Sequence, residues 1–115
     1  MTENAKVHEV MEGMQKNLAR ELEEIEPKAN LKLNNVLEQC YERSNDNADR
    51  FSQCVVESNK RIQDTMEGFQ FKMLFLSRSA KGCLDRGSSV QECTDRISQQ
   101  GKTVIESLLK QIDKI

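Results

Sequence analysis

Between Cys54 and Cys83, apolar side chains recur at steps of three and four residues, the spacing of one face of an α-helix. They are Ile62, Met66, Phe69, Met73, Leu76 and Ala80. Phe71 and Phe75 add a second apolar stripe beside the first. The pattern predicts one long helix over about residues 47–85 that can contact two neighbours at once.

A similar apolar seam precedes this helix and predicts another over about residues 2–44, with Thr2 as its N-cap. The seam consists of Val7, Met11, Met14, Leu18, Leu22, Ile25, Leu33, Val36, Leu37 and Cys40. Pro27 lacks a backbone donor and disfavours helical geometry at Glu26. We therefore expect a kink or a short break near Pro27.

Two polar stretches predict the turns. Residues 44–49 are rich in turn and capping residues, and either Asp46 or Asn47 can cap the central helix. Gly87 suits the left-handed position that follows a helix, and Ser89 and Glu92 have the spacing of a capping box. A third helix over about residues 89–114 has the apolar seam Val90, Cys93, Ile97, Val104, Leu108, Ile112 and Ile115.

The composition supports an all-α fold. Only 4% of the 115 residues are aromatic, and good helix formers dominate the rest. A length of 115 residues predicts a single domain over residues 1–115. We expect three antiparallel helices, long, long and shorter, with Gly68 and Gly101 as weak points inside the second and third.

The charge and hydropathy of the chain limit the classes of partner that it can bind. A net charge of −2 and a pI near 5.5 predict no polybasic face, so we expect no nucleic-acid partner. An apolar run of the ~20 residues that a membrane-spanning helix needs is lacking, so contact with a membrane would be peripheral at most. The first residues resemble neither a secretory signal nor a matrix-targeting peptide.

The sequence does not suggest an enzyme. His8 lacks a nucleophile at a recognisable spacing, and we interpret it as a solvent-exposed side chain. The acidic cluster Glu21, Glu23, Glu24 and Glu26 is interpreted as a solvated helix face, because matching metal ligands do not recur elsewhere. We expect no catalytic residue, no metal, no cofactor and no small-molecule substrate.

Cys40, Cys54, Cys83 and Cys93 are the sharpest clue to the compartment. Structural zinc sites favour cysteine pairs two to four residues apart, and these cysteines lie much further apart. The remaining alternatives are buried thiols without a bonded partner, as in the cytosol, or disulfides in an oxidising compartment.

The spacing ranks the possible disulfides. Pairing Cys40 with Cys93 and Cys54 with Cys83 requires a hairpin near Gly68, with arms of 14 and 10 residues between cysteines. The mismatch is roughly 6 Å of helix, and bridged α-carbons must lie within about 7 Å, so one arm would be distorted. Pairing Cys40 with Cys54 and Cys83 with Cys93 has no such conflict, and we favour it.

Over most of its length the chain resembles the "family with sequence similarity 136" proteins, whose twin CX3C motifs pair across a helical turn in the style of the small Tim chaperones. The resemblance lies in Val36-Leu-Glu-Gln-Cys40 with Cys54-Val-Val-Glu-Ser58, and in Ser79-Ala-Lys-Gly-Cys83 with Cys93-Thr-Asp-Arg-Ile97. It extends to Val7-His-Glu-Val-Met-Glu-Gly-Met-Gln-Lys-Asn-Leu, to Phe69-Gln, and to the tail ending Leu-Leu-Lys-Gln-Ile. Only the inner cysteine of each motif is present. The resemblance implies oxidative import into the mitochondrial intermembrane space.

We therefore predict a non-enzymatic accessory subunit that binds protein subunits of a larger inner-membrane assembly, of the respiratory or ATP synthase type. Phe69, Phe71, Leu74 and Phe75 are its candidate partner-binding residues, because a thin bundle cannot easily bury a helix with two stripes. Packing against the other helices is the alternative for these side chains. Two other functions stay open: a small-Tim-like chaperone for apolar clients, and a cytosolic coiled-coil adaptor with reduced thiols.

Overall fold

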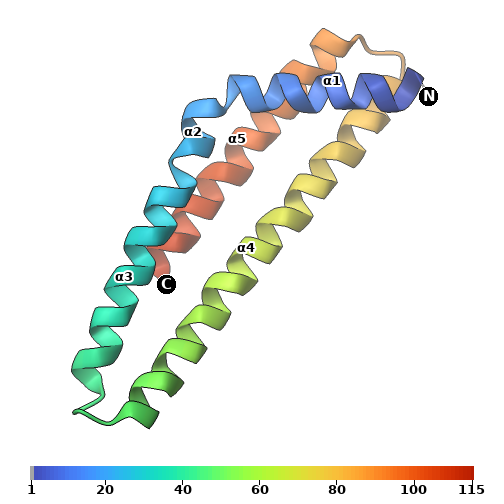
Figure 1. Ribbon diagram of the computed structural model, residues 1–115. Helices are drawn as coiled ribbons and strands as arrows, with labels where there is room; N and C mark the ends of the chain where they lie inside the picture. Colours follow the sequence, from blue (N-terminus) through green and yellow to red (C-terminus); the bar gives the residue numbers. More distant parts are fainter. Residues whose placement is uncertain (1) are drawn as a thin grey trace.

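The computed structural model describes residues 2–115, which form an all-α rod of 62 × 23 × 18 Å (Figure 1). Its segments, in chain order, are α1 Thr2–Asn17, α2 Ala19–Glu23, α3 Ile25–Arg43, α4 Ala48–Asp85 and α5 Val90–Lys114. Helix α4 spans most of the rod, and α3 and α5 run antiparallel to it (Figure 1). The N-cap role expected of Thr2 concerns a side chain outside the described part of the structure.

The prediction of three antiparallel helices is too coarse for the N-terminal part of the chain. The first predicted helix is divided into α1, the short α2 and α3, and α1 crosses obliquely over the ends of α4 and α5 (Figure 1). Leu18 leaves helical geometry, with φ of −110° and ψ of 18°. At Glu24 the backbone N–H bonds the carbonyl of Glu21 instead of continuing the α-helical pattern.

The break expected near Pro27 therefore lies upstream, at Glu24. Pro27 itself lies in the first turn of α3. Backbone N–H groups in a first turn have no intrahelical acceptor, so the missing donor of proline costs nothing there.

Helix α4 passes through Gly68 without interruption. It begins where Asn47 accepts a hydrogen bond from the backbone N–H of Arg50, at 3.1 Å. It ends before Gly87, which has a φ of 89°. Helix α5 begins where Ser89 Oγ accepts from the backbone N–H of Glu92, at 3.1 Å. These are the capping roles that the turn residues predicted.

The hydrophobic core lies where α1, α5 and the C-terminal half of α4 meet. Its most buried members are Val10, Met14, Leu76, Ala80, Cys83, Cys93, Ile97, Ile105 and Leu108. The seams read from the sequence contain most of these positions but omit Val10 and Ile105. Both are 0% exposed and belong to this core.

Glycines allow α1 and α5 to approach closely. A methyl group added at Gly13 would lie 2.6 Å from Thr94 Cγ2, and one added at Gly101 would lie 2.9 Å from Met14 Sδ. Real side chains do not pack at such distances, so a larger residue at either position would force a neighbour to move. The Thr94 methyl group is attached directly to a β-carbon, whereas the Met14 atom belongs to a flexible side chain that can shift more easily. Gly101 is thus a contact point of the core and not only a weak point of its helix.

The far end of the rod contains two helices only, the C-terminal half of α3 and the N-terminal half of α4 (Figure 1). The fully buried residues of α4 all lie at or beyond Leu76. On α3, Val36 and Cys40 are buried. Tyr41 and Phe51 add an edge-to-face ring contact at 6.3 Å between centroids. So little buried apolar surface gives weak noncovalent stabilisation at this end.

Candidate functional site

Two disulfides join the helices that flank each turn of the rod. Cys40 bonds Cys54 across the turn between α3 and α4, with α-carbons 5.6 Å apart. Cys83 bonds Cys93 across the turn between α4 and α5, with α-carbons 5.8 Å apart. This is the local pairing that the spacing favoured. Both ends of α4 are therefore linked covalently to a neighbouring helix.

The two disulfides lie in different surroundings. Cys83 and Cys93 are 1% and 0% exposed and belong to the main core. Cys40 is buried but Cys54 is only partly so, at the end where two helices pack alone. A 14-residue loop closed by a disulfide contributes about 3 kcal/mol in the chain-entropy model. We infer that the Cys40–Cys54 bond compensates for the thin packing at this end.

The candidate partner-binding residues separate into two groups. Phe69 packs against the core and is partly buried. Phe71, Leu74 and Phe75 are 61%, 59% and 62% exposed, so packing against the other helices does not account for them. We call these three side chains the α4 apolar patch. They lie within five consecutive residues of a continuous helix, which holds them in fixed relative positions.

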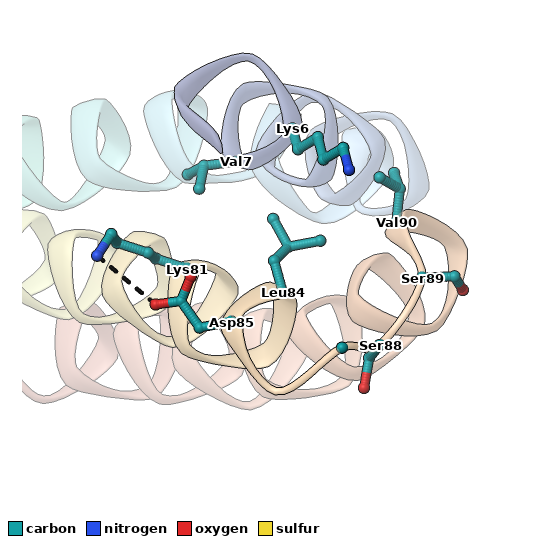
Figure 2. Close-up of a pocket in the computed structure, with 9 residues that line it drawn as sticks. Lys6, Val7, Lys81, Leu84, Asp85, Ser88, Ser89 and Val90 are labelled. Atoms are coloured by element: carbon teal, nitrogen blue, oxygen red, sulfur yellow. Dashed lines mark ion pairs between the residues drawn. The ribbon is translucent and has the colours of Figure 1, made fainter. Parts of the chain in front are cut away.

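A hollow between the start of α1 and the turn from α4 to α5 is shown in Figure 2. Leu84 points toward α1, with Val7 and Val90 on either side of it (Figure 2). Three of the polar side chains that line the hollow have structural partners or roles: Lys81 pairs with Asp85 at 3.6 Å, and Ser89 caps α5. The hollow is thus a packing feature of the turn.

The other candidate groups of the sequence lie on the surface. His8 is exposed, and its Nε2 lies 2.9 Å from Glu12 Oε1 in the next turn of α1. Glu23, Glu24 and Glu26 are exposed and Glu21 is half-buried, as expected of a mainly solvated face. Among the side chains that the structure describes, residues 4–115, no three His, Cys, Asp or Glu groups gather closely enough to hold a metal ion.

Sequence reasoning missed a group of basic side chains between α4 and α5. Arg78 and Arg86 of α4 and Arg96 of α5 line one hollow together with Phe75 and Gly82. Arg78, Gly82 and Arg86 recur every four residues, so they share one face of α4. That spacing could have been noticed in the sequence, whereas the approach of Arg96 requires the tertiary structure.

Among the described residues, no helix is both long enough and apolar enough to cross a membrane. Comparison of the chain with protein-family models, with curated proteins and with solved structures gives no match.

Proposed function

We propose that this chain is a non-enzymatic, disulfide-stapled helical protein of the mitochondrial intermembrane space. It serves as a structural or accessory subunit of a larger inner-membrane assembly, of the respiratory or ATP synthase type. The observation that carries the proposal is the α4 apolar patch, displayed on a rod whose central helix is linked to its neighbours at both ends.

The disulfides support the compartment. Protein disulfides persist in oxidising compartments and are rare in the cytosol, where thiols are kept reduced. The intermembrane space accounts for disulfides together with the cysteine spacing that resembles twin CX3C proteins. A cytosolic adaptor would need reduced thiols, and Cys83 and Cys93 would then lie unbonded within the core.

The apolar patch supports binding to another protein. Burying a Phe or Leu side chain fully contributes about 1.5–3 kcal/mol, and Phe71, Leu74 and Phe75 leave most of that burial unused. Because the patch lies on a continuous helix, binding would order little further backbone, which lowers the entropic cost of association. A permanent subunit interface uses such a patch well.

A small-Tim-like chaperone is the second candidate, because the same patch could cover apolar segments of client proteins. The two functions differ in stoichiometry. A subunit copurifies with its assembly at a fixed ratio, whereas a chaperone forms ring-like oligomers and releases its clients.

The test is purification of the tagged, full-length protein from mitochondria in its oxidised form. Protease protection of intact and outer-membrane-ruptured mitochondria locates the protein, and non-reducing peptide mapping checks the two disulfides. A Phe71→Ser, Leu74→Ser, Phe75→Ser variant removes the patch. The matched control is Leu31→Ser, Val56→Ser, which changes two other exposed apolar residues.

We expect one set of inner-membrane subunits to copurify at a fixed ratio with the wild type and with the control variant. These subunits should be absent from the purified patch variant. Exchangeable, heterogeneous clients would favour the chaperone. Free thiols at all four cysteines, or a protein outside the intermembrane space, would contradict both functions.

A further inference from the structure

Basic side chains line two separate hollows along the boundary of α4 and α5. Most of the α4 residues that line them recur at steps of three or four positions, from Arg61 to Gly82, and Arg86 follows as the C-cap, so both hollows share one face of α4. We call this face the basic groove. Its basic residues are Arg61, Lys72, Arg78, Arg86, Arg96 and Lys114.

The positive charge of the basic groove is not neutralised within the chain. Asp64 is the one acidic side chain that lines the two hollows. The ion pairs among the described residues involve other groups, namely His8 with Glu12, Lys28 with Asp113, and Lys81 with Asp85. Since the whole chain has a net charge of −2, the rest of its surface is acidic.

The groove also has an apolar border and small residues along its floor. Phe75 lines it, and Phe71 and Leu74 lie beside Phe75 on α4. Gly68 and Gly82 line the two hollows, and a methyl group added at Gly68 would meet no atom within 4 Å. Small side chains allow another backbone to approach closely, as a packed helix requires.

We propose that the basic groove binds an amphipathic helix of a partner protein, apolar along its centre and acidic along its flanks. The apolar side chains would cover Phe71 and Phe75, and the carboxylates would pair with the arginines of α4 and α5. From Arg61 to Arg86 the groove is about 38 Å long at 1.5 Å per residue, which accommodates about 25 helical residues. The inference rests on the proposed function, because it names the chemistry of the partner at the same surface.

A helix fits this face better than an anionic bilayer does. The basic residues lie on two helices, along a narrow boundary between them, and a partner helix can follow such a boundary. Asp64 lies within the face and would be repelled by lipid phosphates, whereas one lysine or arginine on a partner helix could pair with it. A helix lying between α4 and α5 can also reach Arg78 on one side and Arg96 on the other.

The test measures binding of the full-length, oxidised protein to a fluorescently labelled synthetic helix by anisotropy. The first peptide has a leucine stripe flanked by glutamates, and the second has each glutamate replaced by glutamine. The third probe is phosphatidylcholine vesicles with and without phosphatidylglycerol. The groove variant is Arg78→Glu, Arg86→Glu, Arg96→Glu. The matched control is Arg20→Glu, Arg43→Glu, Arg50→Glu, three exposed arginines that do not line the groove.

We expect the glutamate peptide to bind about tenfold or more tightly than the glutamine peptide. The groove variant should abolish that preference, the control should keep it, and added salt should weaken it. Equal affinity for both peptides, no binding of either, or an unchanged preference in the groove variant would overturn the inference. Binding to phosphatidylglycerol vesicles instead of the peptides would overturn it in favour of a bilayer surface.

Failure of this inference is separable from failure of the proposed function. If subunits copurify in a manner that depends on Phe71, Leu74 and Phe75 while the peptides show no charge preference, the accessory function stands and the acidic helix does not. If nothing copurifies with the wild type, the proposed function fails whatever the peptides do.

Discussion

The crossing of α1 over α5 makes a quantitative prediction at Gly13. Alanine is favoured over glycine inside a helix by about 0.8–1.0 kcal/mol, so Gly13→Ala would stabilise an isolated α1. In the folded protein its methyl group would lie 2.6 Å from Thr94 Cγ2. Thr94 is buried, and its hydroxyl donates a 2.7 Å hydrogen bond to the Val90 carbonyl, so it cannot easily rotate away.

Overpacking of this kind costs about 1–3 kcal/mol. The net effect of Gly13→Ala is therefore a loss of between about 0 and 2 kcal/mol in the free energy of unfolding. Gly68→Ala is the matched control, because its methyl group meets no atom within 4 Å. It should raise the free energy of unfolding by about 1 kcal/mol.

Thr94→Ser provides a rescue, because it removes Cγ2 and keeps the hydroxyl. Alone it should cost about 0.5–1.5 kcal/mol for the lost buried methyl group. Combined with Gly13→Ala, the new methyl group occupies the vacated space, and the double variant should be about 1–3 kcal/mol more stable than the sum of the single changes.

Urea unfolding of the oxidised proteins, followed by far-UV circular dichroism, measures all four variants. An unchanged denaturant slope would show that the comparison concerns stability alone. If Gly13→Ala were as stabilising as Gly68→Ala, or if the double variant were simply additive, the close approach of α1 and α5 would be refuted.

Three further predictions concern other parts of the rod. Asp46 has a φ of 61°, so Asp46→Gly should raise the free energy of unfolding by about 0.5–1 kcal/mol in thermal melts, and a decrease would contradict the left-handed geometry. The double variant Cys40→Ser, Cys54→Ser should accelerate amide hydrogen exchange only at the end formed by α3 and α4. The double variant Cys83→Ser, Cys93→Ser should lower protection from exchange throughout the rod, because it buries two hydroxyls in the core. The same exchange pattern in both variants would argue against this difference between the two disulfides. Met14→Ala should lower the free energy of unfolding in urea by about 2–5 kcal/mol, because Met14 is 0% exposed. Leu31→Ala, at an exposed position, should leave the free energy of unfolding within about 0.5 kcal/mol of the wild type. Similar losses at the two sites would refute the assigned core.

In the two proposals, neighbouring surfaces of the rod have different roles in binding a partner. The α4 apolar patch supplies burial, and the basic groove beside it supplies orientation and charge selection. A partner that satisfied both would leave the acidic remainder of the chain in water, where charge favours solubility.

Local features of the sequence were sufficient to predict α4, α5 and the two turns that flank α4. Apolar steps of three and four residues predict helices because the helix period is a property of adjacent turns. Asn47, Ser89 and Gly87 act within a few residues of their own positions, so their capping roles could be read directly. The pairing of Cys40 with Cys54 and of Cys83 with Cys93 was also accessible, because each bond spans one short turn.

The tertiary structure alone decided where α1 ends and where it crosses α5. Leu18 and Glu24 have no distinctive sequence signal, yet the helix is interrupted at both, and α1 then crosses α5 at Gly13 and Gly101. The core also contains Val10 and Ile105, which the straight-helix seams omitted.

The basic groove shows most clearly what the sequence could not determine. The net charge of the chain sums all faces, so a total of −2 does not reveal that six basic side chains line the two hollows between α4 and α5. Periodicity places Arg78 and Arg86 on one face of α4, but only packing brings Arg96 of α5 beside them. Helical periods are set by contacts between near neighbours in sequence, whereas a surface between two helices is set by contacts between residues far apart in sequence.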